Sequence, residues 1–297
     1  MTSEITLFVN PAAGGGRGRR AAEPVAEELR RAGFTVRGVR GTDAEDARRC
    51  VRQAVAEGTD ALFAVGGDGL VHMALQAVAG TGVPLGVIAV GTGNDFARSL
   101  GLPVRDPAAA ARLAATALAQ NRAGEIALGR AAGTWFGTVL ASGFDSRVND
   151  RGNRIRLPLG RFKYDVATVA ELAAFRPIPY RLTLDGGEPQ DIEATLVAVG
   201  NGPSYGGGMR ICAGADPREG MFSVTVVGRA TRRDLLKVFP RVYKGTHLEH
   251  PAVTVHRAAR IELAAPGVTA YADGEPLAAL PLAVECRAGA LRVLGVS

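Results

Sequence analysis

Three short apolar runs in the N-terminal third of the chain each end in a glycine-rich loop, and this pattern restricts the fold most strongly. Residues 5–9, 61–65 and 85–90 form these runs, which have the length and composition of buried strands. Amphipathic segments at 21–32 and 44–57 lie between the strands. Strands that alternate with helices predict a parallel sheet covered by helices on both faces. Ligands bind such sheets at the carboxyl ends of the strands, where these loops lie.

The alternation continues to about residue 124 and then changes. A strand is predicted at 34–40, and a helix from Pro107 to Gln120 with Asp106 as its N-cap. Most later segments read as strands: 135–142, 179–185, 192–199, 221–227, 252–257, 260–264, 268–272 and, in pieces, 281–294. Helices are predicted at 161–175 and 231–239. We therefore expect an α/β domain over 1–124 and a mainly antiparallel β domain over 125–297.

The first glycine-rich loop, Asn10 to Gly18, can direct backbone N–H groups at an anion, although a flexible loop has the same composition. It is not a P-loop of the G-x-x-x-x-G-K-[ST] type, because Lys163, Lys237 and Lys244 are the only lysines. The net charge of +6 and the pI of about 9.6 fit an anionic partner, namely a membrane surface, a nucleic acid or a nucleotide. A solvated basic surface explains the charge equally well.

The second and third loops add carboxylates to the glycines. In Gly66-Gly67-Asp68-Gly69, the glycines let phosphates approach the backbone while Asp68 reaches a metal ion. The third loop is Gly91-Thr92-Gly93-Asn94-Asp95-Phe96-Ala97-Arg98, in which Asp95 offers a second carboxylate. Its Thr92 and Asn94 offer hydrogen bonds to phosphate or ribose, and Asn94 alternatively serves as a helix N-cap.

Taken in this order, the three loops resemble the catalytic domain of diacylglycerol kinases, sphingosine kinases and their bacterial lipid-kinase relatives. Gly-Gly-Asp-Gly is shared with NAD kinases and phosphofructokinases, whereas the sequence at 91–98 is typical of the lipid branch. The similarity continues through residues 142–145, 199–208 and 272–276. The resemblance implies an NAD-kinase/phosphofructokinase-like parallel sheet in the first domain and a β-sandwich in the second. The active site is then expected in the cleft between them.

The resemblance also implies an ATP-dependent lipid kinase that uses Mg²⁺ and acts on diacylglycerol or a similar lipid alcohol in phospholipid biosynthesis. The residues it assigns to ATP are Asn10, Pro11, Ala12, Ala13, Gly14, Thr42, Gly66, Gly67, Asp68, Gly69, Leu70, Val71, His72, Thr92 and Asn94. Asp68 and Asp95 would hold the catalytic Mg²⁺, and Glu275 would accept the proton of the substrate hydroxyl. Asp216, Glu219 and the carbonyl group of Met221 would hold a second, structural Mg²⁺.

The chain departs from the family pattern at four positions. Ala13 replaces a serine, Leu70 a threonine, His72 an asparagine and Ala127 an aspartate that is linked to the magnesium network. Glu125, two residues from Ala127 on the same face of a strand, is the candidate substitute. Leu70 and Ala127 favour one alternative, a nucleotide-binding regulatory protein with weak or lost kinase activity. A second alternative is a soluble-substrate kinase of the NAD-kinase type.

The remaining predictions concern location and partners. Cys50, Cys212 and Cys286 are widely spaced, which indicates reduced thiols in a cytoplasmic protein, and no apolar signal segment opens the chain. We expect peripheral contact with an anionic membrane at its inner face, and no nucleic-acid partner; a homodimer remains open. The basic residues expected to make this contact are Arg151, Arg154, Arg156, Arg161 and Lys163.

Overall fold

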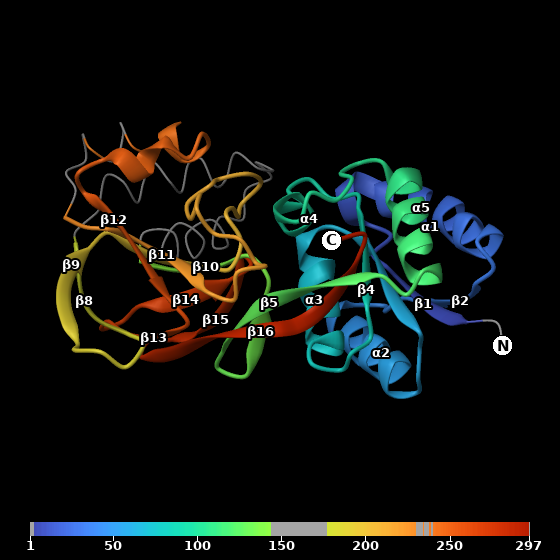
Figure 1. Cartoon of the computed structure of the whole chain (residues 1–297), viewed down its shortest axis with the longest axis horizontal. Coiled ribbons are helices and arrows are strands. Elements are labelled where there is room, and N and C mark those ends of the chain that lie inside the picture. Colours follow the sequence, from blue (N-terminus) through green and yellow to red (C-terminus); the bar gives the residue numbers. More distant parts are fainter. Residues whose placement is uncertain (1–2, 144–176, 230–233, 235–237, 239, 297) are drawn as a thin grey trace.

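The computed structural model of the chain describes residues 3–143, 177–229, 234, 238 and 240–296. Most of its helices gather at one end of the molecule, and its short antiparallel strands gather at the other, together with the short 3₁₀ helix η1 (Thr246–Glu249) (Figure 1). The helical end is formed mostly by the first 120 residues, in blue to green, and the strand-rich end by the later ones. The predicted helix at 161–175 and most of the one at 231–239 lie outside the described residues.

A parallel sheet forms the centre of the helical end. Its strands are β1 (Glu4–Val9), β2 (Thr35–Val39), β3 (Ala61–Gly66) and β4 (Leu85–Ala89), in the order β2-β1-β3-β4. Every pairing among them is parallel, so all four carboxyl ends lie at one edge of the sheet. This confirms the predicted parallel sheet and brings the glycine-rich loops after β1, β3 and β4 together.

Helices cover both faces of this sheet. On one face α1 (Ala13–Arg31) and α5 (Pro107–Ala119) pack in one core with β1, β3 and β4. On the other face α2 (Ala44–Ala56) and α3 (Asp68–Val78) share a second core. As predicted, Asp106 caps α5 by accepting a hydrogen bond from the N–H group of Ala109, and Asp43 caps α2 in the same way. The short helix α4 (Asp95–Ser99) follows the third loop.

Helix α1 begins earlier than the sequence predicts, at Ala13 instead of residue 21. Its first turn is interrupted by Gly14, Gly15 and Gly16, whose φ angles are 60°, 69° and 89°. Glycine is the residue that adopts this left-handed conformation without steric strain. Sequence reasoning placed the start too late because a run of glycines has low helix propensity.

The strand-rich end consists of two sheets packed face to face around one apolar core. The first is the extension of the parallel sheet, through β5 (Ala123–Ala131), β6 (Thr134–Phe136), β8 (Ile178–Leu184), β9 (Gln190–Ala194), β13 (Arg260–Ala264) and β16 (Leu282–Leu294). The second has the order β12-β11-β10-β7-β14-β15 and is antiparallel throughout. Its strands are β7 (Val139–Gly143), β10 (Leu196–Gly200), β11 (Phe222–Val227), β12 (Val253–Ala258), β14 (Thr269–Ala272) and β15 (Glu275–Ala279).

Three strand predictions are wrong in detail. Residues 192–199 form parts of two strands, β9 and β10, which belong to different sheets and are separated at Thr195. Residues 135–142 are likewise divided between β6 and β7. The segment 281–294, which was predicted as several pieces, instead forms one long strand, β16. A bulge between Arg287 and Leu291 bends this strand. Period-2 patterns show that a segment is extended, but they do not show which sheet accepts it.

The strand β16 joins the two ends of the molecule. It pairs with β13 in the strand-rich end and with β4 in the helical end, and β5 runs antiparallel beside it. In Figure 1 it crosses from one end to the other in red. The last strand of the chain therefore completes the sheet that the first strands begin.

Candidate active site

Asp68 lies where the second glycine-rich loop meets α3. It is the first residue of this helix, directly after β3 and Gly67. Its carboxylate accepts hydrogen bonds from two backbone N–H groups of the third loop, those of Asn94 (2.6 Å) and Phe96 (3.2 Å). The side chain thereby ties the loop after β3 to the loop after β4.

Asp95 is buried and connects the third loop to the strand-rich end of the molecule. Its carboxylate accepts hydrogen bonds from Ser204 Oγ at 3.0 Å and from the N–H group of Gly207 at 2.6 Å. Both donors belong to the segment 199–208, which the sequence analysis identified as a motif without assigning a role to each residue. Two motifs more than 100 residues apart thus meet at one carboxylate.

The two carboxylates both lie close to Gly93. A Cβ atom added at residue 93 would come within 2.7 Å of Asp68 Oδ2 and 3.4 Å of Asp95 Oδ2. Burial raises the pKa of Asp68, and the charge of Asp95 raises it further, against the two backbone hydrogen bonds that lower it. The protein thus holds two negative groups together in a poorly solvated position, which favours a cation there.

Glycine is required where the second and third loops touch. A Cβ atom at residue 91 would lie 2.5 Å from the Cα atom of Gly67, and such a contact cannot occur without moving the backbone. The absence of side chains lets the two loops pack backbone against backbone. This close approach is why both loops are glycine-rich, independent of any ligand.

Glu275 comes to the same place from the C-terminal part of the chain. It is exposed, opens β15, and follows the turn Asp273-Gly274, whose residues have φ angles of 52° and 86°. A Cβ atom at Gly69 would lie 4.0 Å from Glu275 Oε1, so this carboxylate lies beside the residue that follows Asp68. The structure therefore brings together Asp68, Asp95 and Glu275 from three separate motifs.

Asp273 has a larger structural role than its place in a turn suggested. Its side chain is only 5% exposed and lies 3.1 Å from Nδ1 of His72 on α3. It also accepts hydrogen bonds from the N–H groups of Gly137 and Thr138 and from Thr138 Oγ1. Because a carboxylate only accepts, Nδ1 of His72 carries the proton. One buried acid thus binds α3 to the β6–β7 connection.

The pKa of Asp273 reflects these contacts. Burial raises it, but the hydrogen bond and charge of His72 and the hydrogen bonds from Thr138 and Gly137 outweigh burial, so that the pKa lies below its usual value. The sequence analysis placed Asp273 in the motif at 272–276 and gave it no role. The available signal was its position two residues before Glu275, but its partners lie about 135 and 200 residues away in the sequence.

The residues predicted to bind ATP follow four different strands, β1, β2, β3 and β4. Asn10 follows β1, where its Oδ1 accepts a hydrogen bond from the N–H group of Ala12. Thr42 lies beyond β2, and both its N–H group and its hydroxyl donate to Asp46. Leu70 and Val71 direct their side chains into the core between sheet and helices, and their N–H groups donate to the carbonyl oxygen of Gly67. The assignment of these residues to ATP stays a prediction.

The structure places Asn94 at the N-cap position that the sequence suggested. It is the residue before α4, but its side chain makes no capping hydrogen bond. Instead Nδ2 donates to the carbonyl oxygen of Gly91 at 3.1 Å, and the residue has a φ angle of 58°. Its buried Oδ1 has no hydrogen-bond partner among the described residues. An unsatisfied buried acceptor beside two carboxylates suits a ligand or ion that donates or is positive.

These side chains fit a magnesium ion. Mg²⁺ is usually bound by one or two carboxylates together with water and substrate phosphates. Asp68 and Asp95 supply two such groups, each with lone pairs left after its hydrogen bonds. Among the described residues no cluster of three or more His, Cys, Asp or Glu side chains is suited to a metal, so the phosphates would complete the coordination.

The two acids predicted to hold the structural Mg²⁺ are each paired with an arginine. Asp216 lies 3.3 Å from the guanidinium group of Arg218, and Glu219 contacts that of Arg257. Ala127 is connected to this region, because its N–H group donates to the carbonyl of Pro217 at 2.7 Å. Glu125 is exposed on β5, and no hydrogen bond of the described residues joins it to Asp68 or Asp95. The structural Mg²⁺ and the substitution by Glu125 both stay predictions.

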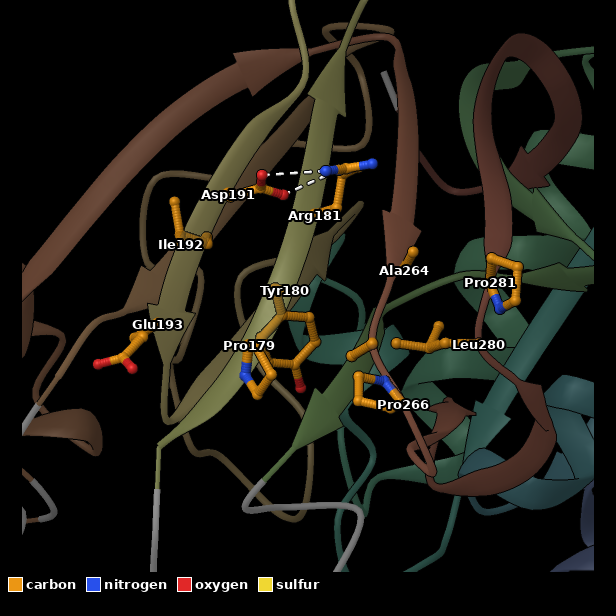
Figure 2. Close-up of a pocket in the computed structure, with 11 residues that line it drawn as sticks. Pro179, Tyr180, Arg181, Asp191, Ile192, Glu193, Ala264, Pro266, Leu280 and Pro281 are labelled. Carbon is orange, nitrogen blue, oxygen red and sulfur yellow. Dashed lines mark hydrogen bonds and ion pairs between the residues drawn. The ribbon is translucent and has the colours of Figure 1, made fainter.

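A pocket of about 580 Å³ lies at the β8–β9 edge of the large sheet, among none of the predicted site residues (Figure 2). Its walls are Pro179, Tyr180, Arg181, Asp191, Ile192, Glu193, Ala264, Ala265, Pro266, Leu280 and Pro281. Arg181 and Asp191 form an ion pair with two hydrogen bonds at its rim, with distances of 2.8 and 3.0 Å.

The predicted basic membrane segment, residues 151–163, lies outside the described residues. No helix in the described part of the chain is long and apolar enough to span a bilayer.

Two family models match the chain. Residues 4–131 match the diacylglycerol kinase catalytic domain, and residues 138–295 match the YegS C-terminal NAD kinase beta sandwich-like domain. A diacylglycerol kinase from Mycobacterium tuberculosis is 44% identical over 98% of this chain and 94% of its own length. A probable lipid kinase, YegS-like, from Pseudomonas aeruginosa is 31% identical over 84% of this chain and 80% of its own.

Solved structures share the fold. A putative diacylglycerol kinase from Bacillus anthracis superimposes with a TM-score of 0.80 at 22% identity, over 98% of this chain and 95% of the other. An NAD kinase from Archaeoglobus fulgidus, solved in complex with ATP, gives a TM-score of 0.57 at 14% identity, over 100% and 94%. These similarities confirm the predicted architecture of a parallel α/β sheet followed by a β-sandwich.

Proposed function

Because the chain belongs to the diacylglycerol kinase catalytic domain family, we propose that it transfers the γ-phosphate of ATP to the hydroxyl group of diacylglycerol or a similar lipid alcohol. It is a phosphotransferase with an alcohol group as acceptor, as its family is. ATP, Mg²⁺, the lipid acceptor, phospholipid biosynthesis and a membrane-facing location are the finer parts of the proposal.

The observation that carries the proposal is the convergence of three carboxylates from three motifs. Asp68 and Asp95 both lie close to Gly93, and Glu275 lies beside Gly69. Phosphoryl transfer asks a protein mainly to position its substrates and to neutralise developing charge. The buried carboxylate of Asp95 beside the half-buried one of Asp68 suits a divalent ion, and a third, exposed carboxylate suits a proton acceptor.

The roles follow from these positions. Asp68 and Asp95 would hold Mg²⁺, which when bound offsets the negative charge of the phosphates. Glu275 would accept the proton of the lipid hydroxyl while the oxygen of that hydroxyl bonds to the γ-phosphorus. The bond between the γ-phosphorus and the oxygen that bridges it to the β-phosphate breaks. The products are the phosphorylated lipid, ADP and a proton. The buried contacts of Asp273 hold Glu275 against α3, because the two residues share one tight turn.

The test is phosphate transfer from radiolabelled ATP to defined acceptors. Diacylglycerol in mixed micelles, sphingosine in micelles and soluble NAD would be offered separately, with and without Mg²⁺. Label in phosphatidic acid is the expected result, and label in NADP would favour the soluble-substrate alternative. ATP binding measured by calorimetry without transfer to any acceptor would favour the regulatory alternative, for which Leu70 and Ala127 are the supporting residues.

A further inference from the structure

Four consecutive backbone carbonyl groups of the third loop are held by arginine side chains from three different segments. Arg17, on α1, donates from Nε to the carbonyl oxygen of Val90 and from Nη2 to that of Gly91, both at 2.9 Å. Arg105 donates to the carbonyl oxygen of Thr92 at 3.2 Å, and Arg98 to that of Gly93 at 3.0 Å. Three arginines from different parts of the sequence thus donate to the carbonyl groups of four consecutive residues, 90–93.

The N–H groups of the same loop are left available. None of the described residues accepts a hydrogen bond from the N–H group of Gly91, Thr92 or Gly93. The next N–H group, that of Asn94, donates to Asp68. Three successive N–H groups without an acceptor, whose carbonyl groups are held by guanidinium groups, have a positive character, which is typical of phosphate-binding backbone.

Two of these contacts depend on special backbone. Arg17 can reach across to Val90 because Gly14, Gly15 and Gly16 adopt left-handed conformations just before it, and a Cβ atom at Gly14 would lie 2.2 Å from the Val90 carbonyl oxygen. Arg105 itself has a φ angle of 63°, which is unusual for a residue other than glycine, asparagine or aspartate. Strain of this kind persists where the surrounding structure requires it, often at a functional site.

We infer that Arg17, assisted by Arg98 and Arg105, is a positioning residue that fixes the third loop. In this position the N–H groups of Gly91–Gly93 receive the phosphates of a nucleoside triphosphate. The inference rests on the proposed function for the presence of a nucleotide. No lysine precedes Lys163, so the P-loop solution to phosphate binding is not available to this half of the chain. A guanidinium fork that grips two neighbouring carbonyl groups holds the backbone in a way that a lysine cannot reproduce.

The experiment compares Arg17→Gln, Arg17→Lys and a matched control, Arg19→Gln, in the full-length chain. Arg19 is an exposed arginine on the same helix, with no side-chain contact to the third loop among the described residues, so the control removes the same charge. Three measurements are made: the Kd of Mg-ATP by calorimetry, kcat and KM for ATP and for diacylglycerol, and hydrogen exchange of the Asn94 amide without ligand.

Arg17→Gln is expected to raise the Kd and KM for ATP at least about tenfold, the usual effect of losing a hydrogen bond to a charged group. KM for diacylglycerol should stay within about threefold, and the amide of Asn94, which is hydrogen-bonded to Asp68, should exchange faster. If the two hydrogen bonds of the guanidinium group hold the loop, Arg17→Lys should behave like Arg17→Gln, and Arg19→Gln should behave like the wild type. A general loss of structure would instead change both KM values and lower the melting temperature together.

Each other outcome overturns the inference. Wild-type ATP affinity in Arg17→Gln, with the wild-type chain binding ATP, would remove the role of Arg17 and leave the proposed function standing. Full recovery by Arg17→Lys would show that charge is sufficient and that no fork holds the loop. If Arg19→Gln weakens ATP binding as much as Arg17→Gln does, the loss of affinity comes from the removed charge on the helix and not from the contacts of Arg17. A wild-type chain that binds no ATP would overturn the proposed function and this inference together.

Discussion

Individual acids in this protein are defined by partners that lie far away in the sequence. Asp68 and Asp273 are both carboxylates in short Gly- and Asp-containing turns, yet their environments shift their pKa values in opposite directions. Asp68 is buried beside another acid and receives two N–H groups, whereas Asp273 faces a histidine and three further donors. The first is suited to attract a cation, and the second to hold parts of the chain together.

Replacement of Asp68 by alanine should lower kcat for lipid phosphorylation by roughly 10²–10³, the usual effect of losing one electrostatic group at a reaction centre. Initial rates at saturating ATP, Mg²⁺ and diacylglycerol measure it. Asp191→Ala, on the distant strand β9, is the control for removal of an aspartate and should retain full activity. Turnover near that of the wild type in Asp68→Ala would contradict the assignment of this residue to the metal.

Replacement of Asp273 by asparagine should reduce the free energy of unfolding by about 2–3 kcal/mol at neutral pH, because an amide cannot accept from all four donors around it. The pH dependence has a defined sign. Since the pKa of Asp273 is lower in the folded protein, its contribution is present above about pH 4 and is lost as the pH falls through the folded value.

Urea unfolding of wild type and Asp273→Asn across the acid range tests this. The difference in the free energy of unfolding between them should shrink as the pH falls below about 4. A difference that does not change with pH would show that Asp273 is not ionised in the folded protein. Thr138→Val, which removes one donor and keeps the carboxylate, serves as the control and should retain the pH dependence.

At the scale of elements, a strand end or hairpin turn carries each acid of the candidate site. Asp68 follows the loop after β3, Asp95 lies at the end of the loop after β4, and Glu275 opens β15 directly after the β14–β15 turn. Parallel pairing of β3 and β4 brings the first two together, and Asp273 attaches the hairpin to α3. The site therefore depends on the registers of two sheets, and small shifts of the hairpin should affect catalysis more than nucleotide binding.

Glu275→Gln should leave the Kd of ATP unchanged and lower kcat by about 10²–10⁴, because glutamine has nearly the same shape and cannot accept the proton. Calorimetry with ATP and single-turnover phosphate transfer separate the two effects. Glu188→Gln, in the exposed β8–β9 connection, provides the matched control. A raised KM for ATP with normal kcat would make Glu275 a binding residue instead.

At the scale of the whole molecule, the helical end depends on the last strand of the chain. Val293 of β16 pairs with Leu85 of β4, and Leu291 and Val293 are buried in the core with α2 and α3. Leu294 belongs to the core on the opposite face of the same sheet. The boundary predicted between residues 124 and 125 therefore separates segments that share one sheet, and independent folding of the first segment stays a prediction to be tested.

Leu291→Ala should lower the free energy of unfolding by about 2–5 kcal/mol, the range found when a buried leucine leaves a cavity. Because Leu291 packs against residues of the first half, ATP binding should be lost in the same urea transition. Residues 1–124 expressed alone should show no cooperative unfolding, since the open edge of β4 would lack β16. A stable fragment that binds ATP would show that β16 is dispensable for the helical end.

The sequence by itself determined the elements of the helical end and the identity of the motifs. Apolar runs, N-cap residues such as Asp106 and glycines after strands depend on local physical chemistry, so β1, β3, β4, α2 and α5 were predictable within one or two residues. The three glycine-rich loops were predictable as neighbours because parallel strands end at one edge. The spacing of Asp68, Asp95 and Glu275 in family motifs identified them as candidates without showing how they are held.

Only the tertiary structure decided how these parts are held. The division of residues 192–199 between two sheets, the passage of β16 from one end to the other, and the burial of Asp273 follow from packing between distant segments. The same holds for the arginines that occupy the carbonyls of Val90 to Gly93, since an exposed and a bridging arginine look alike in the sequence. Long-range pairing has no local signal, because each partner satisfies its own local preferences whichever partner it meets.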